Sequence, residues 1–292
     1  MSREDLSEIE DKNITNADLQ SLKIVLGLSE FEYKNDISIV VELTEEGAIE
    51  KINKLSQTLS NMKGKTIVPV SFRKKIGQLI ASTVLTPDIS NVYFDLLSYE
   101  GVEFYPYGTQ EVDEYLSTHS EAIPIIKYDQ LFVAAEDEKC LGVERNNIKI
   151  KEQKLSIKDY ERKESCTVFV IGNNVKKEFV MENLNLSASY RGANLTIKNY
   201  EKNQTNKLIK DIKATKGLKN VVILSDDKVS SDSYDANTFV TLIALQTEFP
   251  DRKNLNFITE LLDSKNLNCI KDFNINNAII SNKIISLLLT QL

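Results

Sequence analysis

Residues 166–172 read Cys-Thr-Val-Phe-Val-Ile-Gly, and this stretch decides the fold. Six β-branched, aromatic and apolar residues that stop at a glycine are typical of a strand buried on both faces of a sheet. The chain downstream alternates in the same way, with helices predicted over 175–184 and 207–214 and strands over 193–197 and 220–225. Strands that alternate with helices predict a parallel sheet covered on both faces, which is a Rossmann-like α/β lobe.

An internal repeat extends this fold to the start of the chain. Asp18-Leu-Gln-Ser-Leu-Lys-Ile-Val-Leu-Gly-Leu28 and Asp235-Ala-Asn-Thr-Phe-Val-Thr-Leu-Ile-Ala-Leu245 match in the aspartate, a hydroxyl residue and one apolar helix face, 217 positions apart. Each is followed by a strand-like segment that ends in an acid, Glu42 or Glu260, and these acids lie 218 positions apart. The conserved spacing predicts two copies of one helix–strand unit.

The first copy lacks its front half, because only a short polar lead precedes the helix near Asp18. A parallel sheet without its central strands leaves strand edges open. We therefore expect the chain to be a fragment of a longer protein or to take the missing strands from a partner. The predicted organisation is a truncated Rossmann-like lobe over 1–97, a small α+β lobe over 98–152 and a second, more complete Rossmann-like lobe over 153–292.

The small lobe is predicted from short strands over 102–107, 123–126 and 131–135, with a helix over 111–116 between the first two. The single histidine, His119, follows this helix in a polar stretch and is interpreted as part of an exposed loop.

Composition excludes several classes of function. The chain has 36 Lys and Arg against 43 Asp and Glu, a net charge of −7 that argues against a nucleic-acid partner. Three distant cysteines and one histidine fit a reducing compartment and leave no usual zinc site. No window of about 18 apolar residues exists to span a membrane, and the polar N-terminus is not a signal peptide. A soluble, cytoplasmic protein is expected.

The turn after the strand over 166–171 is where a dinucleotide fold would hold a phosphate. The fingerprint for such a site has three glycines, and only Gly172, followed by Asn173, is present. The acid that would bind ribose hydroxyls falls near Asn199, which is not acidic. Gly172, Asn173 and Asn199 are therefore candidate ligand contacts, but the incomplete motif argues against NAD and favours a vestigial turn.

A second candidate site is the carboxyl end of the strand over 220–225, where open α/β sheets bind ligands. Ser225, Asp226 and Asp227 lie there, and two adjacent carboxylates could contribute oxygens to Ca²⁺. The alternative is a capping or turn role, which general considerations favour. The sequence contains no nucleophile elbow, P-loop or zinc-protease motif and offers no catalytic constellation, so we do not expect an enzyme.

In order along the chain, these segments resemble the cytosolic RCK (regulator of K⁺ conductance) region of the Castor/Pollux family of ion channels and its bacterial relatives. The likeness covers nearly the whole chain. It lies in the helix from Asp18 and the strand ending at Glu42, in Leu-Leu-Ser-Tyr-Glu-Gly-Val-Glu-Phe-Tyr over 96–105, in Ala-Ile-Pro over 122–124 and Val-Ala-Ala-Glu-Asp over 133–137, and in Ile-Leu-Ser-Asp-Asp over 223–227 with the helix from Asp235. The pore helices and the front of the first lobe are absent from this sequence, and the second lobe lacks one β–α pair.

The resemblance implies a regulatory module that gates a cation channel, such as a potassium channel, when it binds a ligand. It implies a homo-oligomer at the inner face of the membrane, with a channel pore as partner and Ca²⁺ as the leading effector. Asp226, Asp227 and Asp235 are the first residues to consider as Ca²⁺ ligands. Two alternatives stay open: a ligand-free Rossmann-like assembly scaffold and, third, an enzyme that uses a nucleotide cofactor.

Overall fold

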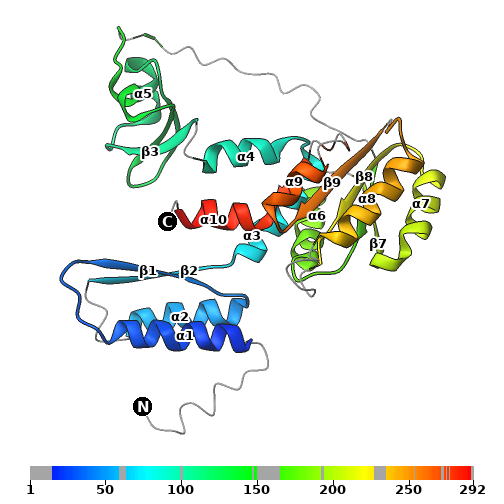
Figure 1. Ribbon diagram of the computed structural model, residues 1–292. Coiled ribbons are helices and arrows are strands. Elements are labelled where there is room, and N and C mark those ends of the chain that lie inside the picture. Colours follow the sequence, from blue (N-terminus) through cyan, green and yellow to red (C-terminus); the bar gives the residue numbers. More distant parts are fainter. Residues whose placement is uncertain are drawn as a thin grey trace. The chain divides into compact units, whose positions relative to one another are not determined.

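A computed structural model describes residues 15–58, 64–98, 101–146, 148–149, 165–191, 194–226, 235–252, 254–270, 273, 275 and 277–290 (Figure 1). The protein has the predicted α/β fold with parallel sheets. The chain divides into two compact units, Met1–Gln78 and Leu79–Gln291. This division falls inside one helix, earlier than the predicted boundary at residue 97, and the predicted three-lobe boundaries stay predictions.

The first unit contains one helix–strand repeat. Its elements are α1 (Asn16–Ser29), β1 (Ile37–Glu42), α2 (Glu46–Thr58), β2 (Lys65–Val70) and the start of α3 (Phe72–Leu85). β1 and β2 pair in parallel, with Ile39 opposite Ile67. The apolar faces of α1 and α2 cover this pair, and the core consists of Leu22, Val25, Ile39, Val41, Leu43, Ala48, Ile52 and Ile67.

The second unit contains a five-stranded, fully parallel sheet in the order β10-β9-β8-β6-β7. The strands are β6 (Cys166–Ile171), β7 (Leu195–Tyr200), β8 (Leu218–Ile223), β9 (Leu255–Leu261) and β10 (Asn277–Ile280). The helices are α4 (Ile89–Leu97), α6 (Lys177–Arg191), α7 (Thr205–Ala214), α8 (Ala236–Glu248), α9 (Leu267–Ile270) and α10 (Ser281–Thr290), with short 3₁₀ turns η3 (Lys202–Gln204) and η5 (Ser264–Asn266). The strand order reverses between β6 and β8, as in doubly wound folds.

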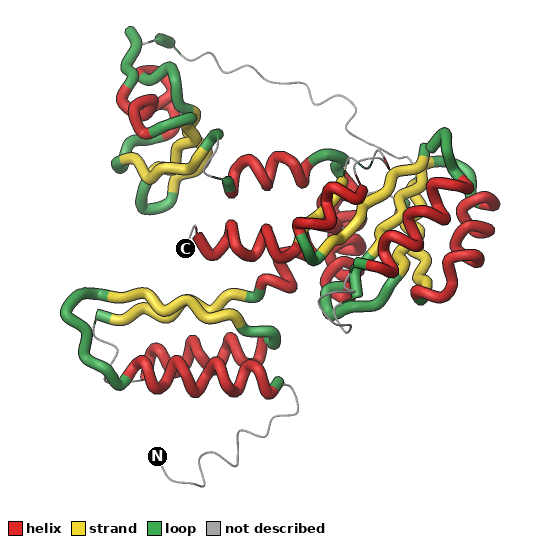
Figure 2. The backbone as a smooth tube through the Cα atoms, in the orientation of Figure 1, coloured by secondary structure: helices red, strands yellow, loops and turns green. Residues whose placement is uncertain are grey.

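One core of this sheet lies between one sheet face and the helices α7 to α9. Because strand side chains alternate between faces, Phe169, Val221 and Phe257 point to the same side. They pack with Leu208 of α7 and Leu245 of α8, both fully buried. The tube view shows these two helices lying along the strands (Figure 2).

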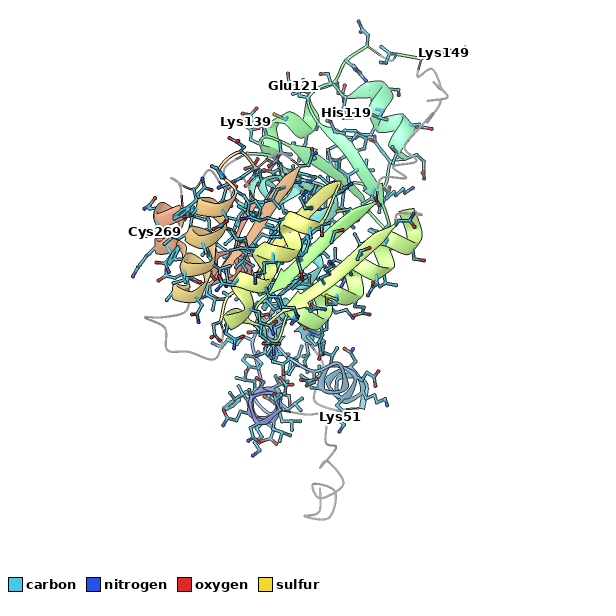
Figure 3. The ribbon with its side chains drawn as sticks, turned by 90° about the vertical axis from the view of Figure 1, so that its right-hand side faces the viewer. Lys51, His119, Glu121, Lys139, Lys149 and Cys269 are labelled. Atoms are coloured by element: carbon cyan, nitrogen blue, oxygen red, sulfur yellow. The ribbon has the colours of Figure 1, made fainter. Side chains whose placement is uncertain are left out.

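The small lobe follows its prediction except at His119. β3 (Glu103–Tyr107), β5 (Leu131–Ala135) and β4 (Ile123–Lys127) form an antiparallel sheet in that order, and α5 (Val112–Thr118) and the 3₁₀ turn η2 (Glu138–Gly142) complete the lobe. The interpretation of His119 as an exposed loop residue is wrong, because the residue is only 5% exposed. Figure 3 labels its position in the small lobe. As the residue after α5, it folds back to stack on Tyr115 at 4.0 Å between ring centres.

The predicted repeat is confirmed at the level of individual hydrogen bonds. Asp18 is 1% exposed and accepts the backbone N–H groups of Thr44 (2.8 Å) and Glu45 (3.1 Å). Asp235 is 2% exposed and accepts those of Leu262 (3.0 Å) and Asp263 (3.2 Å). Both aspartates therefore fasten the start of a helix to the turn after the next strand. This arrangement is called the aspartate clamp below.

Among the residues that the structure describes, no helix combines the length and the apolar character needed to span a membrane.

Candidate functional site

The carboxyl ends of β6 and β8 meet at the reversal of strand order, where open α/β sheets bind their ligands. Gly172, directly after β6, has a φ of +104°, a backbone conformation that favours glycine. A Cβ atom at this position would lie 2.7 Å from the carbonyl oxygen of Leu224. The Leu224 N–H also donates to the Ile171 carbonyl (3.0 Å). The turn after β6 thus packs directly on the chain that leaves β8.

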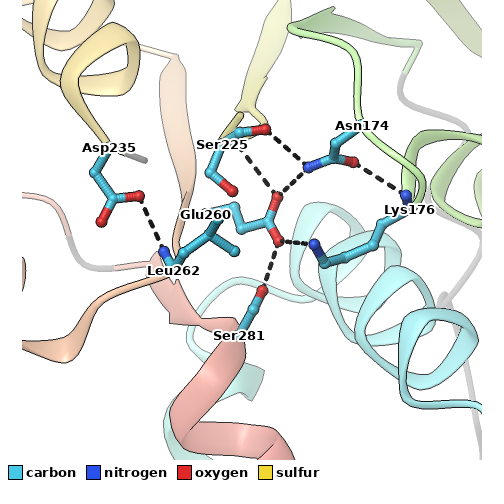
Figure 4. A network of polar contacts seen from close by, with 7 residues as sticks. All are labelled: Asn174, Lys176, Ser225, Asp235, Glu260, Leu262 and Ser281. Carbon is cyan, nitrogen blue, oxygen red and sulfur yellow. Dashed lines mark hydrogen bonds and ion pairs between the residues drawn. The ribbon is translucent and has the colours of Figure 1, made fainter. Parts of the chain in front are cut away.

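A buried ionic network lies beside this junction and is centred on Glu260 of β9 (Figure 4). Its Oε1 atom pairs with the Lys176 ammonium (3.0 Å) and accepts the Ser281 hydroxyl (2.5 Å). Its Oε2 atom accepts the Asn174 side-chain amide (2.8 Å) and the Ser225 backbone N–H (3.2 Å). Four elements therefore meet on one carboxylate: the turn after β6, the end of β8, β9 itself and the start of α10.

Burial makes this network energetically demanding. The side chains of Lys176 and Glu260 are 7% and 0% exposed, and two buried charges are tolerated only where they are paired and hydrogen-bonded. Asn174 completes the arrangement, since its amide group also donates to the Ser225 carbonyl (3.0 Å) and its Oδ1 accepts the Lys176 N–H (3.1 Å). Both oxygens of Glu260 and the side-chain amide of Asn174 are thus bonded to other atoms of the chain.

Asp235, a predicted metal ligand, serves the aspartate clamp of the second unit. Its Oδ1 accepts one backbone N–H, and its Oδ2 accepts a second one together with the side-chain amide of Asn266 (2.7 Å). It precedes α8 without capping that helix through its side chain. Because both oxygens already accept hydrogen bonds in a buried setting, binding a cation there would break contacts that hold the chain.

Asp226, the second predicted metal ligand, lies just after β8 and is 8% exposed. Its carboxylate forms an ion pair with Lys202 in η3, which follows β7. The pair joins the ends of two strands that are not adjacent in the sheet. Asp227 lies outside the described residues.

The remaining predicted contacts do not converge on one point. Ser225 is fully buried and serves the Glu260 network through its backbone; its hydroxyl has no hydrogen-bond partner among the described residues. Asn173 and Asn199 are both exposed. The strand that carries Asn199 ends instead in Tyr200, whose ring is buried and whose hydroxyl donates to Asp211 of α7. Burial, together with this hydrogen bond, raises the pKa of Tyr200.

The described residues do not fit a Ca²⁺ site. Calcium takes six to eight oxygen ligands, and nowhere in the described part of the chain do three His, Cys, Asp or Glu side chains gather as a metal site requires. Asp226 is paired with a lysine and both oxygens of Asp235 are engaged. A pocket lined by Lys219, Phe249 and Leu255, among others, lies at the opposite, amino-terminal end of β8 and β9 and includes none of the predicted contacts.

No model of a known protein family matches the chain, and no curated protein matches it in sequence.

Sequence reasoning missed the centre of this site. The sequence marks Glu260 only as the acid that ends a repeated strand, and it gives no prediction for Asn174, Lys176 or Ser281. A signal did exist, because Glu260 interrupts Phe-Ile-Thr-Glu-Leu-Leu, and a glutamate within such a run is rarely buried without a partner. Its partners come from segments up to 86 residues away, which the sequence does not connect.

Proposed function

We propose that the chain is a cytosolic, RCK-type regulatory module that gates a cation channel and assembles as a homo-oligomer at the inner face of the membrane. The observation that carries the proposal is the pair of aspartate clamps at Asp18 and Asp235, because it gives each unit one copy of the same helix–strand element. Together with a small α+β lobe between the copies in the sequence, this is the order that the resemblance to Castor/Pollux channels implies. The proposed role is regulatory and includes no catalytic step.

Gating requires that an effector bind two states of the assembly with different affinity. The carboxyl end of the second sheet is the place where such a difference would arise, because β6, β8, β9 and α10 all meet at Glu260. An effector that competes for Lys176 or for the Asp226–Lys202 pair would loosen this junction. A movement of α10 relative to the sheet would then transmit the signal.

A second candidate is a ligand-free assembly scaffold. The specific observation in its favour is that Asn174, Lys176 and Ser281 satisfy Glu260 from within the chain. A site whose polar groups are already paired gives a ligand little to gain. In this alternative the Rossmann-like sheet serves only to hold subunits together.

The first experiment measures thermal unfolding and sedimentation of the metal-stripped full chain with Ca²⁺, Mg²⁺, NAD or ATP at millimolar concentration. A ligand at about 100 times its dissociation constant adds about 2.7 kcal/mol of stability. The gating module predicts a self-associating chain whose stability and association both change with one of these probes. The scaffold predicts association that no probe alters. A chain that stays monomeric and unaltered would contradict both.

A matched pair of variants tests the involvement of Asp226. Lys202→Met removes the cation that pairs with Asp226, whereas Lys210→Met removes an exposed cation from α7. If Asp226 takes part in binding a cation, Lys202→Met increases the stabilisation by Ca²⁺ and Lys210→Met leaves it unchanged. Equal responses of both variants would remove Asp226 from the proposed effector site.

A further inference from the structure

The two copies of the repeat differ in what covers them. The helix α1 corresponds to α8 at an offset of 217, so Ile24 corresponds to Thr241 and Leu28 to Leu245. Thr241 and Leu245 are 5% and 0% exposed, whereas Ile24 is 63% exposed and Leu28 is 36% exposed. Two apolar residues of α1, Ile24 and Leu28, thus lie open at positions that the second unit buries.

The strands show the same contrast. β9 is paired on both sides, by β8 and by β10, whereas among the described residues β1 is paired only by β2. Glu260 on β9 is 1% exposed, and its counterpart Glu42 on β1 is exposed. The covering elements of the second unit are therefore identifiable: β8 pairs with β9, and α7 packs against α8.

The open edge of β1 can be assigned residue by residue. Ile37 and Leu43 donate their N–H groups toward the β2 side, to the carbonyls of Gly64 (2.8 Å) and Val70 (3.0 Å). Successive residues of a strand direct their backbone groups to opposite neighbours. The N–H groups of Ser38, Val40 and Glu42 therefore face the edge where the second unit has β8.

We infer that this edge of β1 and the exposed face of α1 form one docking surface for a helix–strand unit of the α7–β8 type. Its strand pairs with β1 in parallel. In the second unit Val221 lies opposite Phe257, and Phe257 corresponds to Ile39 at the strand offset of 218. The partner residue equivalent to Val221 therefore lies opposite Ile39. Its helix lays an apolar face like that of Leu208 and Ile212 on Ile24 and Leu28. Strand addition to an open sheet edge is a common recognition mode.

The chemistry of the partner follows from the occupied copy. β8 reads Leu-Lys-Asn-Val-Val-Ile and is buried from Asn220 onward, so the partner strand is β-branched and apolar along its second half. α7 buries Leu208, Ile209 and Ile212 and exposes lysines on its other face. A second copy of this chain would bind in another way, because two-fold symmetry would pair β1 with the β1 strand of that copy in an antiparallel arrangement. The parallel pairing in the second unit favours the helix–strand unit.

The test supplies such a unit to the intact chain. Residues 165–231 are placed a second time ahead of Thr15, in place of residues 1–14, which reproduces the repeat offset. Amide hydrogen exchange is followed in the parent chain and in this graft. We expect the N–H groups of Ser38, Val40 and Glu42 to exchange about tenfold or more slowly in the graft.

Two substitutions show whether α1 takes part. Ile24→Asp changes the proposed contact, and Lys23→Asp changes a residue whose counterpart Val240 is 66% exposed. In the graft, Ile24→Asp should return the three amides to the parent rates, and Lys23→Asp should not. In the parent chain, neither substitution should change these rates.

Several results would overturn the inference. One is a graft whose copied segment folds, by its own amide protection, while the β1 edge exchanges as in the parent. A copied segment that stays unfolded in the graft also overturns the inference, because a complementary edge of β1 would bind and order it. Edge amides that slow with increasing concentration of the parent chain alone would assign the surface to a second copy instead.

Discussion

Replacing Glu260 with glutamine tests whether the buried network holds the second sheet together. The substitution keeps the size and much of the hydrogen bonding of the side chain, and removes its charge. Lys176, whose side chain is only 7% exposed, then remains as a buried ammonium without its counter-ion. Removing one partner of a buried ion pair typically costs about 3–5 kcal/mol, more than the intact pair contributes.

The chain provides its own control. Glu42→Gln makes the same chemical change at the corresponding position of the first repeat, where the side chain is exposed. We expect this variant to lie within about 0.5 kcal/mol of the parent, as surface substitutions do. A second control combines Glu260→Gln with Lys176→Met. It should regain a large part of the loss, because it removes the unpaired buried charge.

The assay must report on the second sheet alone, since two compact units need not unfold in one step. Amide exchange of β8 and β9 meets this need, because these buried strands exchange only when the sheet opens. A loss of 3–5 kcal/mol speeds their exchange by about two to three and a half orders of magnitude. Equal, small effects of Glu260→Gln and Glu42→Gln, or a further loss on adding Lys176→Met, would refute the reasoning.

Three further predictions concern single positions. Asp18→Asn and Asp235→Asn should each lower the free energy of unfolding by about 1–3 kcal/mol, because each leaves a buried backbone N–H poorly paired. Amide exchange should show this loss of stability only in the unit that carries the substitution, and a loss in both units would contradict independent clamps. Gly172→Ala should destabilise the second sheet by about 1–3 kcal/mol in urea unfolding, since its φ is +104° and the new Cβ would meet Leu224. The control Gly27→Ala in α1 should stabilise the chain by up to about 1 kcal/mol, and similar effects at both glycines would argue against strain at the junction. Because the pKa of Tyr200 is raised above its ordinary 10.0, its contribution to stability is fully present below pH 10.0 and is lost as the pH rises through the higher folded value. The pKa values of Tyr105 and Tyr115 are also raised, so ultraviolet titration of the folded chain should lose one of several late-titrating phenols in Tyr200→Phe, and a late phase of unchanged amplitude would show the assignment to be wrong.

Local patterns predicted most of the fold. The buried run from Cys166 to Ile171 is β6. The spacing between Asp18 and Asp235 predicted two copies of one helix–strand element, and the aspartate clamps confirm them. These features are readable because strand composition and repeat spacing are properties of short stretches. His119 was misjudged for the opposite reason: its burial depends on Tyr115 one helical turn earlier and Tyr107 on another strand, and no polarity pattern reports such packing.

The candidate site was predicted less well than the fold. Sequence reasoning predicted a site at the carboxyl end of the sheet, the end where the Glu260 network lies, because strand ends and topology determine where polar residues gather. It chose Asp226 and Asp235 by residue type, whereas the structure gives them an ion pair with Lys202 and a clamp role. The role of a carboxylate depends on which donors reach it, and Glu260 takes its donors from three other segments: the turn after β6, the end of β8 and the start of α10.

The aspartate clamp also bears on how such a chain could arise. Its bonds span 26 to 28 residues, from the start of a helix to the turn after the next strand, and need nothing from the rest of the sheet. Gene duplication can copy a stretch of this length together with the hydrogen bonds of its clamp. The flanking strands of one copy can then diverge, be deleted or be supplied by another polypeptide, while the helix–strand element keeps its clamp.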